Sequence, residues 1–106
     1  MTEVNIPYNE RFREDMLGGL KICTSRNKKY GNIGDIFPAF DARFEITRLL
    51  RLELSDVAEV LYFPEGFDSP EEFIEFWRSI HPRKGFVPDQ KVWTHFFRRI
   101  DVAHVR

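Results

Sequence analysis

The chain has 106 residues, which is enough for one domain over residues 1–106 and too few for two. Apolar residues make up 42% of it, no apolar run approaches the roughly 18 residues of a membrane span, and the formal net charge is −1. These properties exclude a membrane-spanning helix and a domain that is basic throughout. With a single cysteine, Cys23, they favour a cytoplasmic protein that has no internal disulfide bond and no membrane partner.

The small net charge hides an uneven distribution along the chain. Residues 1–34 hold six Lys or Arg against four Asp or Glu, residues 35–77 hold three against eleven, and residues 78–106 hold seven against two. If the two ends of the chain meet in the fold, they form a mildly basic face that would suit a phosphate-bearing or nucleoside ligand. The alternative is an ordinary solvated surface.

The first part of the chain predicts a short helix followed by a strand. The helix covers residues 9–17, because Asn9 can cap it and two glycines follow it. Residues 21–26 are rich in β-branched side chains, and the polar residues 27–32 predict a loop. A turn that contains glycines therefore leads into the first strand.

Three further strands are predicted from alternation of apolar and polar residues. They cover residues 36–40, 43–52 and 90–100. Arg48 is the one polar residue in the apolar phase of the second of these strands, so we expect a bend or a barrel edge near it.

Two helices are predicted between the third and fourth strands. Ser55 is expected to cap the first, which stops before Pro64. The second starts with a capping box at residues 69–72, in which Ser69 is the cap, and it continues to Ile80. This order of elements predicts an α+β fold, with a curved antiparallel sheet and helices to one side.

Several common chemistries lack their residues in this chain. One cysteine cannot supply the ligands of a zinc deaminase, the glycine-rich phosphate loops are absent, and the histidines have no metal-ligand spacing. No nucleophile elbow supports a Ser-His-Asp triad, although spacing alone does not exclude one. We therefore expect neither a metal nor another cofactor.

The segment after the two glycines carries the strongest chemical signal. Lys21, Thr24 and Arg26 lie within six residues. A lysine of lowered pKa can act as a base, a hydroxyl can be the nucleophile that it activates, and a guanidinium can hold a carbonyl, phosphate or base edge. In a regular strand Lys21 and Thr24 would point to opposite faces, so joint action requires a bend between them. The alternative is a basic loop that enters a strand.

The pattern Gly19-x-Lys21-x-x-Thr24-x-Arg26 resembles the signature of the ASCH family, Gly-x-Lys-x-x-[Glu/Thr]-x-Arg. The resemblance extends loosely over nearly the whole chain. It implies a PUA-like curved antiparallel β-barrel with about three flanking helices. Such a barrel has an interior cleft suited to RNA or a modified nucleoside.

One small bacterial member of that family removes the acetyl group from N(4)-acetylcytidine, and the resemblance assigns roles by analogy with it. Lys21 and Thr24 match its base and nucleophile without a gap. A shift of one residue makes Glu65 the counterpart of its proton donor. Backbone N–H groups near Gly19 would hold the oxyanion, and Arg26 would orient the pyrimidine.

Other members of the family are proposed to bind or cleave RNA, so the sequence leaves three functions open: an amidohydrolase, a non-catalytic RNA-binding module and a ribonuclease. In each case the expected partner is RNA or a modified nucleoside, and the expected state is a monomer. Phe40, Trp93 and Phe97 could stack on a base, but core packing is the favoured interpretation for Phe40 and Trp93. For Cys23 we expect a small buried apolar side chain rather than a nucleophile.

Overall fold

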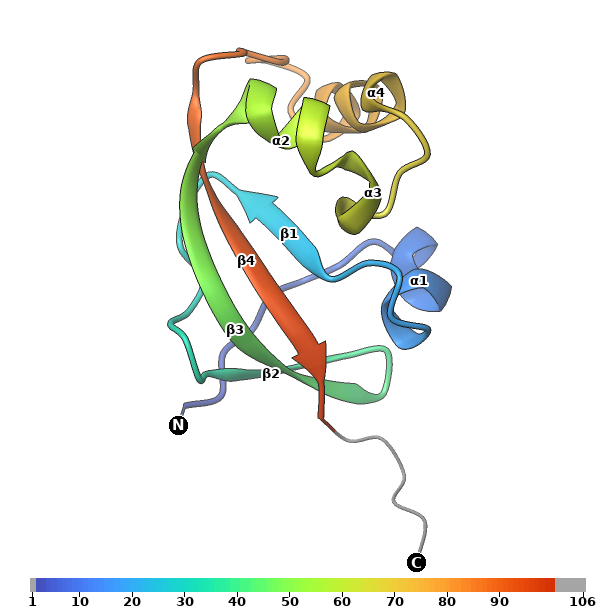
Figure 1. Cartoon of the computed structure of the whole chain (residues 1–106), viewed down its shortest axis with the longest axis vertical. Helices are drawn as coiled ribbons and strands as arrows, with labels where there is room; N and C mark the ends of the chain where they lie inside the picture. The colour runs from blue at the N-terminus through green and yellow to red at the C-terminus, as the bar shows by residue number, and fades with distance from the viewer. Residues whose placement is uncertain (1, 101–106) are drawn as a thin grey trace, which may run out of the picture.

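One curled sheet forms the frame of the molecule, and the computed structural model describes it over residues 2–100 (Figure 1). Within that range the sheet has four antiparallel strands in the order β1-β4-β3-β2. The elements in chain order are a 3₁₀ turn, η1 (Glu10–Phe12), α1 (Arg13–Leu17), β1 (Cys23–Arg26), β2 (Ile36–Ala39), β3 (Ala42–Glu53), α2 (Leu54–Val60), α3 (Tyr62–Glu65), α4 (Pro70–Ile80) and β4 (Lys91–Arg99). The predicted α+β fold is confirmed, with the sheet as a curled half-barrel.

The curl of the sheet follows from its long third strand. β3 pairs with β2 at its start and with β4 along most of its length. Its register with β4 shifts between Ile46 and Arg48, which leaves Thr47 as the extra residue of a bulge. A bulge bends a strand and increases its twist, so the irregularity expected near Arg48 is confirmed and contributes to the curvature seen in Figure 1.

The N-terminal and C-terminal parts of the described chain meet in the sheet. β1 pairs with β4 from Cys23 opposite Phe96 to Arg26 opposite Trp93. The N-terminal segment also joins the sheet, because Glu3 forms an isolated parallel bridge with Ile36. The segments that carry the two positive ends of the chain therefore lie side by side, over the residues that the structure describes.

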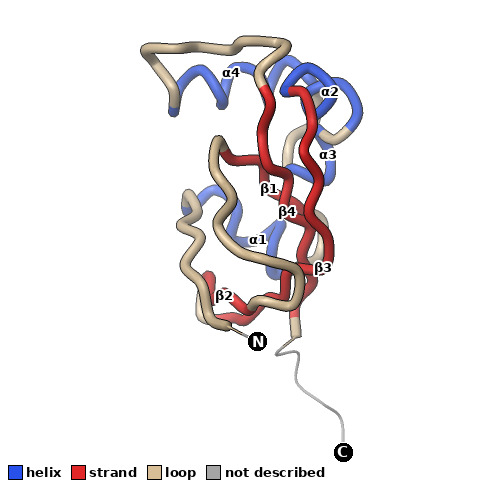
Figure 2. The backbone as a smooth tube through the Cα atoms, turned by 90° about the vertical axis from the view of Figure 1, so that its left-hand side faces the viewer, coloured by secondary structure: helices blue, strands red, loops and turns tan. Residues whose placement is uncertain are grey.

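Three of the helices gather at one end of the sheet, and α1 lies further along it (Figures 1 and 2). The capping predicted for α4 is confirmed, since the Ser69 side chain accepts a hydrogen bond from the Glu72 N–H at 3.1 Å. Asn9 likewise accepts from the Arg11 N–H at 2.9 Å at the start of η1. The helices between residues 2 and 100 are all too short or too polar to cross a lipid bilayer.

The prediction for residues 55–64 was wrong at the start of the helix. α2 begins at Leu54 without a side-chain cap, because the N–H groups of Leu54 and Ser55 donate to the Gln90 and Pro88 carbonyls of the loop before β4. α2 ends at Val60, before Pro64 as expected, and Pro64 lies inside α3, a separate single turn in which a proline near the start costs no hydrogen bond. The described chain therefore has four α-helices instead of about three.

Aromatic side chains build the core in two clusters. Phe37, Phe44 and Phe97 pack on one another with ring centroids 5.4–5.5 Å apart, and Tyr8 stacks on Phe37. The second cluster joins η1 to α4 through the rings of Phe12, Phe67, Phe73, Phe76 and Trp77. Phe97 is thus a core residue.

Candidate functional site

A cavity of about 470 Å³ opens beside β1, and α3, α4 and the residues around η1 supply the rest of its lining. Its polar lining includes Lys21, Thr24, Ser25, Arg26 and Glu65. Its aromatic lining includes Phe12, Phe67, Phe73, Phe76 and Trp77. The remaining lining residues are Pro7, Asn9, Asn27, Lys28, Tyr30, Ile80 and His81.

Lys21 reaches this cavity because the chain bends before β1 begins. The turn after α1 is held by Asp15, whose carbonyl accepts hydrogen bonds from the Leu20 and Lys21 N–H groups at 2.8 and 3.0 Å. The next N–H, that of Ile22, donates to the Pro64 carbonyl in α3 rather than to a neighbouring strand. Lys21 therefore precedes the regular strand, and its side chain and that of Thr24 line the same cavity.

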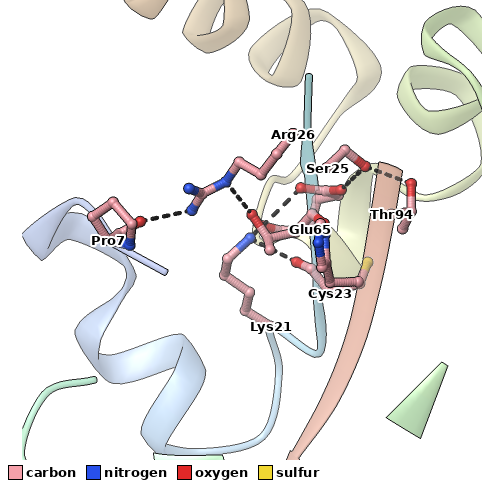
Figure 3. Close-up of polar contacts among 9 residues, drawn as sticks. Pro7, Lys21, Cys23, Ser25, Arg26, Glu65 and Thr94 are labelled. Atoms are coloured by element: carbon pink, nitrogen blue, oxygen red, sulfur yellow. Dashed lines mark hydrogen bonds and ion pairs between the residues drawn. The ribbon is translucent and has the colours of Figure 1, made fainter. Parts of the chain in front are cut away.

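The Lys21 ammonium group is buried with only 2% of the residue exposed, and backbone oxygens surround it (Figure 3). Its Nζ donates to the Cys23 carbonyl at 2.8 Å and to the Glu65 carbonyl at 2.5 Å. The same nitrogen lies 3.6 Å from Glu65 Oε1 and 4.4 Å from the centroid of the Phe12 ring. Lys21 and Glu65 thus form a buried ion pair across the junction of β1 and α3.

Burial acts in opposite directions on the two members of this pair. Removal from water lowers the pKa of Lys21 below its ordinary value and raises the pKa of Glu65 above its own, while each partner's charge opposes that effect. Both shifts reduce the free-energy difference between the charged pair and the neutral pair that forms when a proton moves from nitrogen to carboxylate. The site can therefore hold a lysine that accepts protons beside a glutamic acid that donates them.

The position of Glu65 depends on the residue that follows it. Gly66 ends α3 in the left-handed region with φ of 107°, where its N–H donates to the Phe63 carbonyl. A Cβ at this position would lie 3.2 Å from the Phe12 ring and 3.3 Å from Lys21 Cδ. The glycine therefore allows the chain to turn away beside the ion pair without displacing Lys21.

Thr24 and Arg26 are joined to each other. Arg26 Nε donates to Thr24 Oγ1 at 3.0 Å, and its NH2 group donates to the Pro7 carbonyl at 2.7 Å. The guanidinium carbon lies 5.0 and 5.4 Å from the ring centroids of Tyr8 and Tyr30. Arg26 is thus held by the protein through Nε and one terminal nitrogen, and its Nε supports the Thr24 hydroxyl.

Ser25 contacts the other oxygen of the Glu65 carboxylate. Its Oγ donates to Glu65 Oε2 at 2.6 Å and lies 2.7 Å from Thr94 Oγ1 on β4. Sequence reasoning did not single out Ser25, because its two partners are 40 and 69 residues away in the chain. Two features of the sequence could have identified Ser25: it is adjacent to Thr24 in β1, and it lies inside the family signature.

His95, on β4, contacts both the backbone of β1 and the loop that follows β1. Its Nε2 accepts a hydrogen bond from the Tyr30 N–H at 3.0 Å, so in the neutral ring the proton resides on Nδ1, which lies 3.3 Å from the Thr24 carbonyl. The residue is fully buried, and this burial lowers the pKa of the imidazole. His95 thereby ties the loop of Tyr30 to the backbone of Thr24.

This arrangement predicts an acid-sensitive component of stability. Because the pKa of His95 is lower in the folded than in the unfolded protein, its contribution is present above the unfolded value of about 6.5 and is lost as the pH falls through the folded value. We expect the difference in unfolding free energy between the wild type and His95→Gln to shrink as the pH falls from 7.5 to 5 (about the working range of an imidazole), measured by urea denaturation. A difference that stays constant over that range would contradict the assignment.

The structure brings together four of the five site residues expected from the sequence. Lys21, Thr24, Arg26 and Glu65 line one cavity. Gly19 instead borders a separate hollow of about 290 Å³, and its N–H donates to the Met16 carbonyl at 3.3 Å. Among residues 2–100, no three His, Cys, Asp or Glu side chains are grouped as a metal ion would require.

The rings considered as stacking platforms lie elsewhere. The guanidinium of Arg13 lies over Phe40, at 5.1 Å from the ring centroid, and Trp93 has the Arg51 guanidinium over its ring at 4.9 Å. Neither ring lines the cavity. The rings that do line it come chiefly from α4.

The fold of this chain is similar to that of several solved structures. No protein-family model matches it, and no curated protein matches it. The hypothetical protein PH0355 superposes with a TM-score of 0.73 at 16% identity, over 94% of this chain and 100% of that one. An ASCH domain from Lactobacillus crispatus JV V101 gives 0.67 at 15% identity over 92% and 79%. Protein EF3133 from Enterococcus faecalis V583 gives 0.69 at 18% identity over 100% and 86%.

Proposed function

We propose, from the premise that this chain has the fold of ASCH domains, that it hydrolyses the amide bond of an acylated cytidine such as N(4)-acetylcytidine. One observation carries the proposal: Lys21, Glu65 and the Thr24 hydroxyl line the same cavity, and the first two form a buried pair. Its volume of about 470 Å³ is in the range of small-molecule sites, and its aromatic lining suits a planar ring.

The first half of the reaction uses the neutral form of the buried pair. Thr24 Oγ attacks the acetyl carbonyl carbon while its proton passes to the Lys21 amine. As the carbon–nitrogen bond breaks, Glu65 gives its proton to the exocyclic nitrogen, and cytidine leaves. The products are acetyl-Thr24, a Lys21 ammonium and a Glu65 carboxylate, so the pair ends in its charged form.

The second half restores the starting state. The Glu65 carboxylate takes a proton from water, whose oxygen attacks the acetyl ester, and the Lys21 ammonium returns a proton to Thr24 Oγ as acetic acid leaves. Lys21 Nζ donates to two carbonyls in the resting site. Transfer from Thr24 therefore requires that it exchange one of them for Thr24 Oγ1 or use a bridging water in the cavity.

Arg26 has a different role in this proposal from the one that the resemblance suggested. Its Nε already donates to Thr24 Oγ1 at 3.0 Å, which favours the developing negative charge on that oxygen. Orientation of the pyrimidine falls instead to the cavity's rings, among which Phe76 is only partly buried. The proposed binding mode is therefore ring against ring, with the acetyl group directed toward Thr24.

The test is direct hydrolysis. Purified protein is incubated with N(4)-acetylcytidine, and cytidine and acetate are measured by chromatography. We expect turnover by the monomeric protein without added metal. An N(4)-methylcytidine control, which has no amide carbonyl, should remain intact. Absence of cytidine from the acetylated substrate at any pH between 5 and 9 would overturn the proposal.

A second function is favoured by one separate observation: β1–β4 pairing brings the two positively charged ends of the chain together. A non-catalytic module would use this side, with Lys28 at the cavity, to contact RNA phosphates. Binding to a single-stranded RNA would then weaken steeply with salt. A protein that binds RNA in this way but leaves N(4)-acetylcytidine intact would favour the module over the hydrolase.

A further inference from the structure

A chain of hydroxyl groups connects the centre of the sheet to Glu65. Ser25 on β1 lies directly opposite Thr94 on β4 in the register, and both residues are buried. Ser25 has a single O–H proton, which it donates to Glu65 Oε2 at 2.6 Å. The contact of 2.7 Å between Ser25 Oγ and Thr94 Oγ1 must therefore use the Thr94 proton. The hydroxyl groups therefore donate in one direction, from Thr94 to Ser25 and from Ser25 to Glu65; Figure 3 shows the contacts.

This chain makes the two carboxylate oxygens of Glu65 unequal. Oε2 is engaged as the acceptor of the Ser25 proton, whereas Oε1 lies 3.6 Å from Lys21 Nζ. A proton that binds to Oε2 would face the Ser25 proton and require the whole hydroxyl chain to reverse. A proton that binds to Oε1 leaves the chain unchanged.

We infer that Ser25, oriented by Thr94, is a positioning residue that keeps Glu65 Oε2 as an acceptor and so places the exchangeable proton on Oε1, beside Lys21. The inference rests on the proposed function, because it specifies where the proton of the acid is held. The inference also goes beyond the proposed function, because the family signature leaves the residue between Thr24 and Arg26 unspecified.

The hydroxyl chain of Thr94 and Ser25 also limits the effect of burial on the pKa of Glu65. A hydrogen bond donated to a carboxylate favours the ionised form, so Ser25 lowers the pKa of Glu65 against the larger effect of desolvation. If the two hydroxyl groups only filled space beside Glu65, their removal would leave its ionisation unchanged. The pKa of Glu65 is therefore the quantity that separates the two roles.

The first arm of the test needs no substrate. Protein containing glutamate labelled with ¹³C at the carboxyl carbon is titrated by NMR, and Glu65→Gln identifies the Glu65 resonance. We expect Ser25→Ala to raise the pKa of Glu65, and Thr94→Val to raise it less. Thr94→Ser and Ser25→Thr, which keep the hydroxyls, should remain close to wild type. An unchanged pKa in Ser25→Ala, or a lowered pKa in Thr94→Val, would overturn the inference.

The second arm is kinetic. With N(4)-acetylcytidine, we expect Ser25→Ala to lower kcat by about tenfold or more with little change in KM, because a misplaced catalytic group can cost up to about 10²-fold. The acidic limb of the pH profile should move in the same direction as the NMR pKa. Wild-type protein that shows no hydrolysis removes the proposed function, whereas the titration still decides the role of Ser25. Normal kcat in Ser25→Ala removes the inference alone.

Discussion

Replacement of Lys21 by methionine is expected to lower the free energy of unfolding by about 3–5 kcal/mol, because it leaves the Glu65 carboxylate buried without its cation. Glu65→Gln should destabilise the protein for the converse reason, since Lys21 Nζ then keeps its carbonyl partners but loses the opposing charge. Both residues are almost fully buried, so the charge that remains is solvated far less than it would be at the surface. The measurement is urea denaturation at pH 7.

The double variant Lys21→Met/Glu65→Gln makes this prediction specific to the pair. We expect it to recover much of the stability lost in either single variant, because a buried ion pair is often no more stabilising than neutral groups of similar volume. The coupling free energy in this cycle should be about 0.5–3 kcal/mol. Lys84→Met, at an exposed lysine, is the matched control and should stay within about 0.5 kcal/mol of wild type. Strictly additive single variants would show that the two side chains do not act as a pair.

Loss of the Thr24 hydroxyl is expected to have the largest effect on catalysis. Thr24→Val keeps the branched shape of the side chain but removes the proposed nucleophile, so hydrolysis of N(4)-acetylcytidine should fall by at least about 10²–10⁴-fold. The change in stability should be about 0.5–1.5 kcal/mol, since Arg26 Nε loses one acceptor and keeps its other contacts.

Thr24→Ser is the control for this experiment, because it retains a hydroxyl at the same position and should retain measurable turnover. Acetyl-Thr24 should also be detectable by mass spectrometry in wild-type protein quenched during turnover and absent from Thr24→Val. Turnover in Thr24→Val at the wild-type rate would show that water attacks the amide directly and that Thr24 is not the nucleophile.

The parts of the fold that the sequence predicted are those specified by neighbouring residues. The caps at Asn9 and Ser69 involve partners two or three residues away, and both are present. The bulge beside Arg48 was visible as one polar residue in an apolar phase. The start of α2 was not visible, because its first N–H groups bond to carbonyls more than thirty residues further along the chain.

In the candidate site, too, the sequence predicted the residues that are close together in the chain and not the contacts between distant segments. Lys21, Thr24 and Arg26 are close in sequence, and Glu65 was reached only through a family resemblance. The link between Ser25 and Thr94 depends on the register of β1 against β4, which alternation in either strand does not determine. The aromatic lining depends on where α4 lies relative to β1, which helical spacing along the sequence does not determine.

Cys23, the only cysteine in the chain, lies at the start of the strand that carries Thr24 and Ser25. Its side chain is buried, and the loss of water around it raises the pKa of the thiol well above its ordinary value. An alkylating reagent can therefore reach a reactive thiolate only when the structure around β1 opens locally. The rate of alkylation therefore measures how often this region opens, and a ligand bound in the cavity is expected to lower that rate.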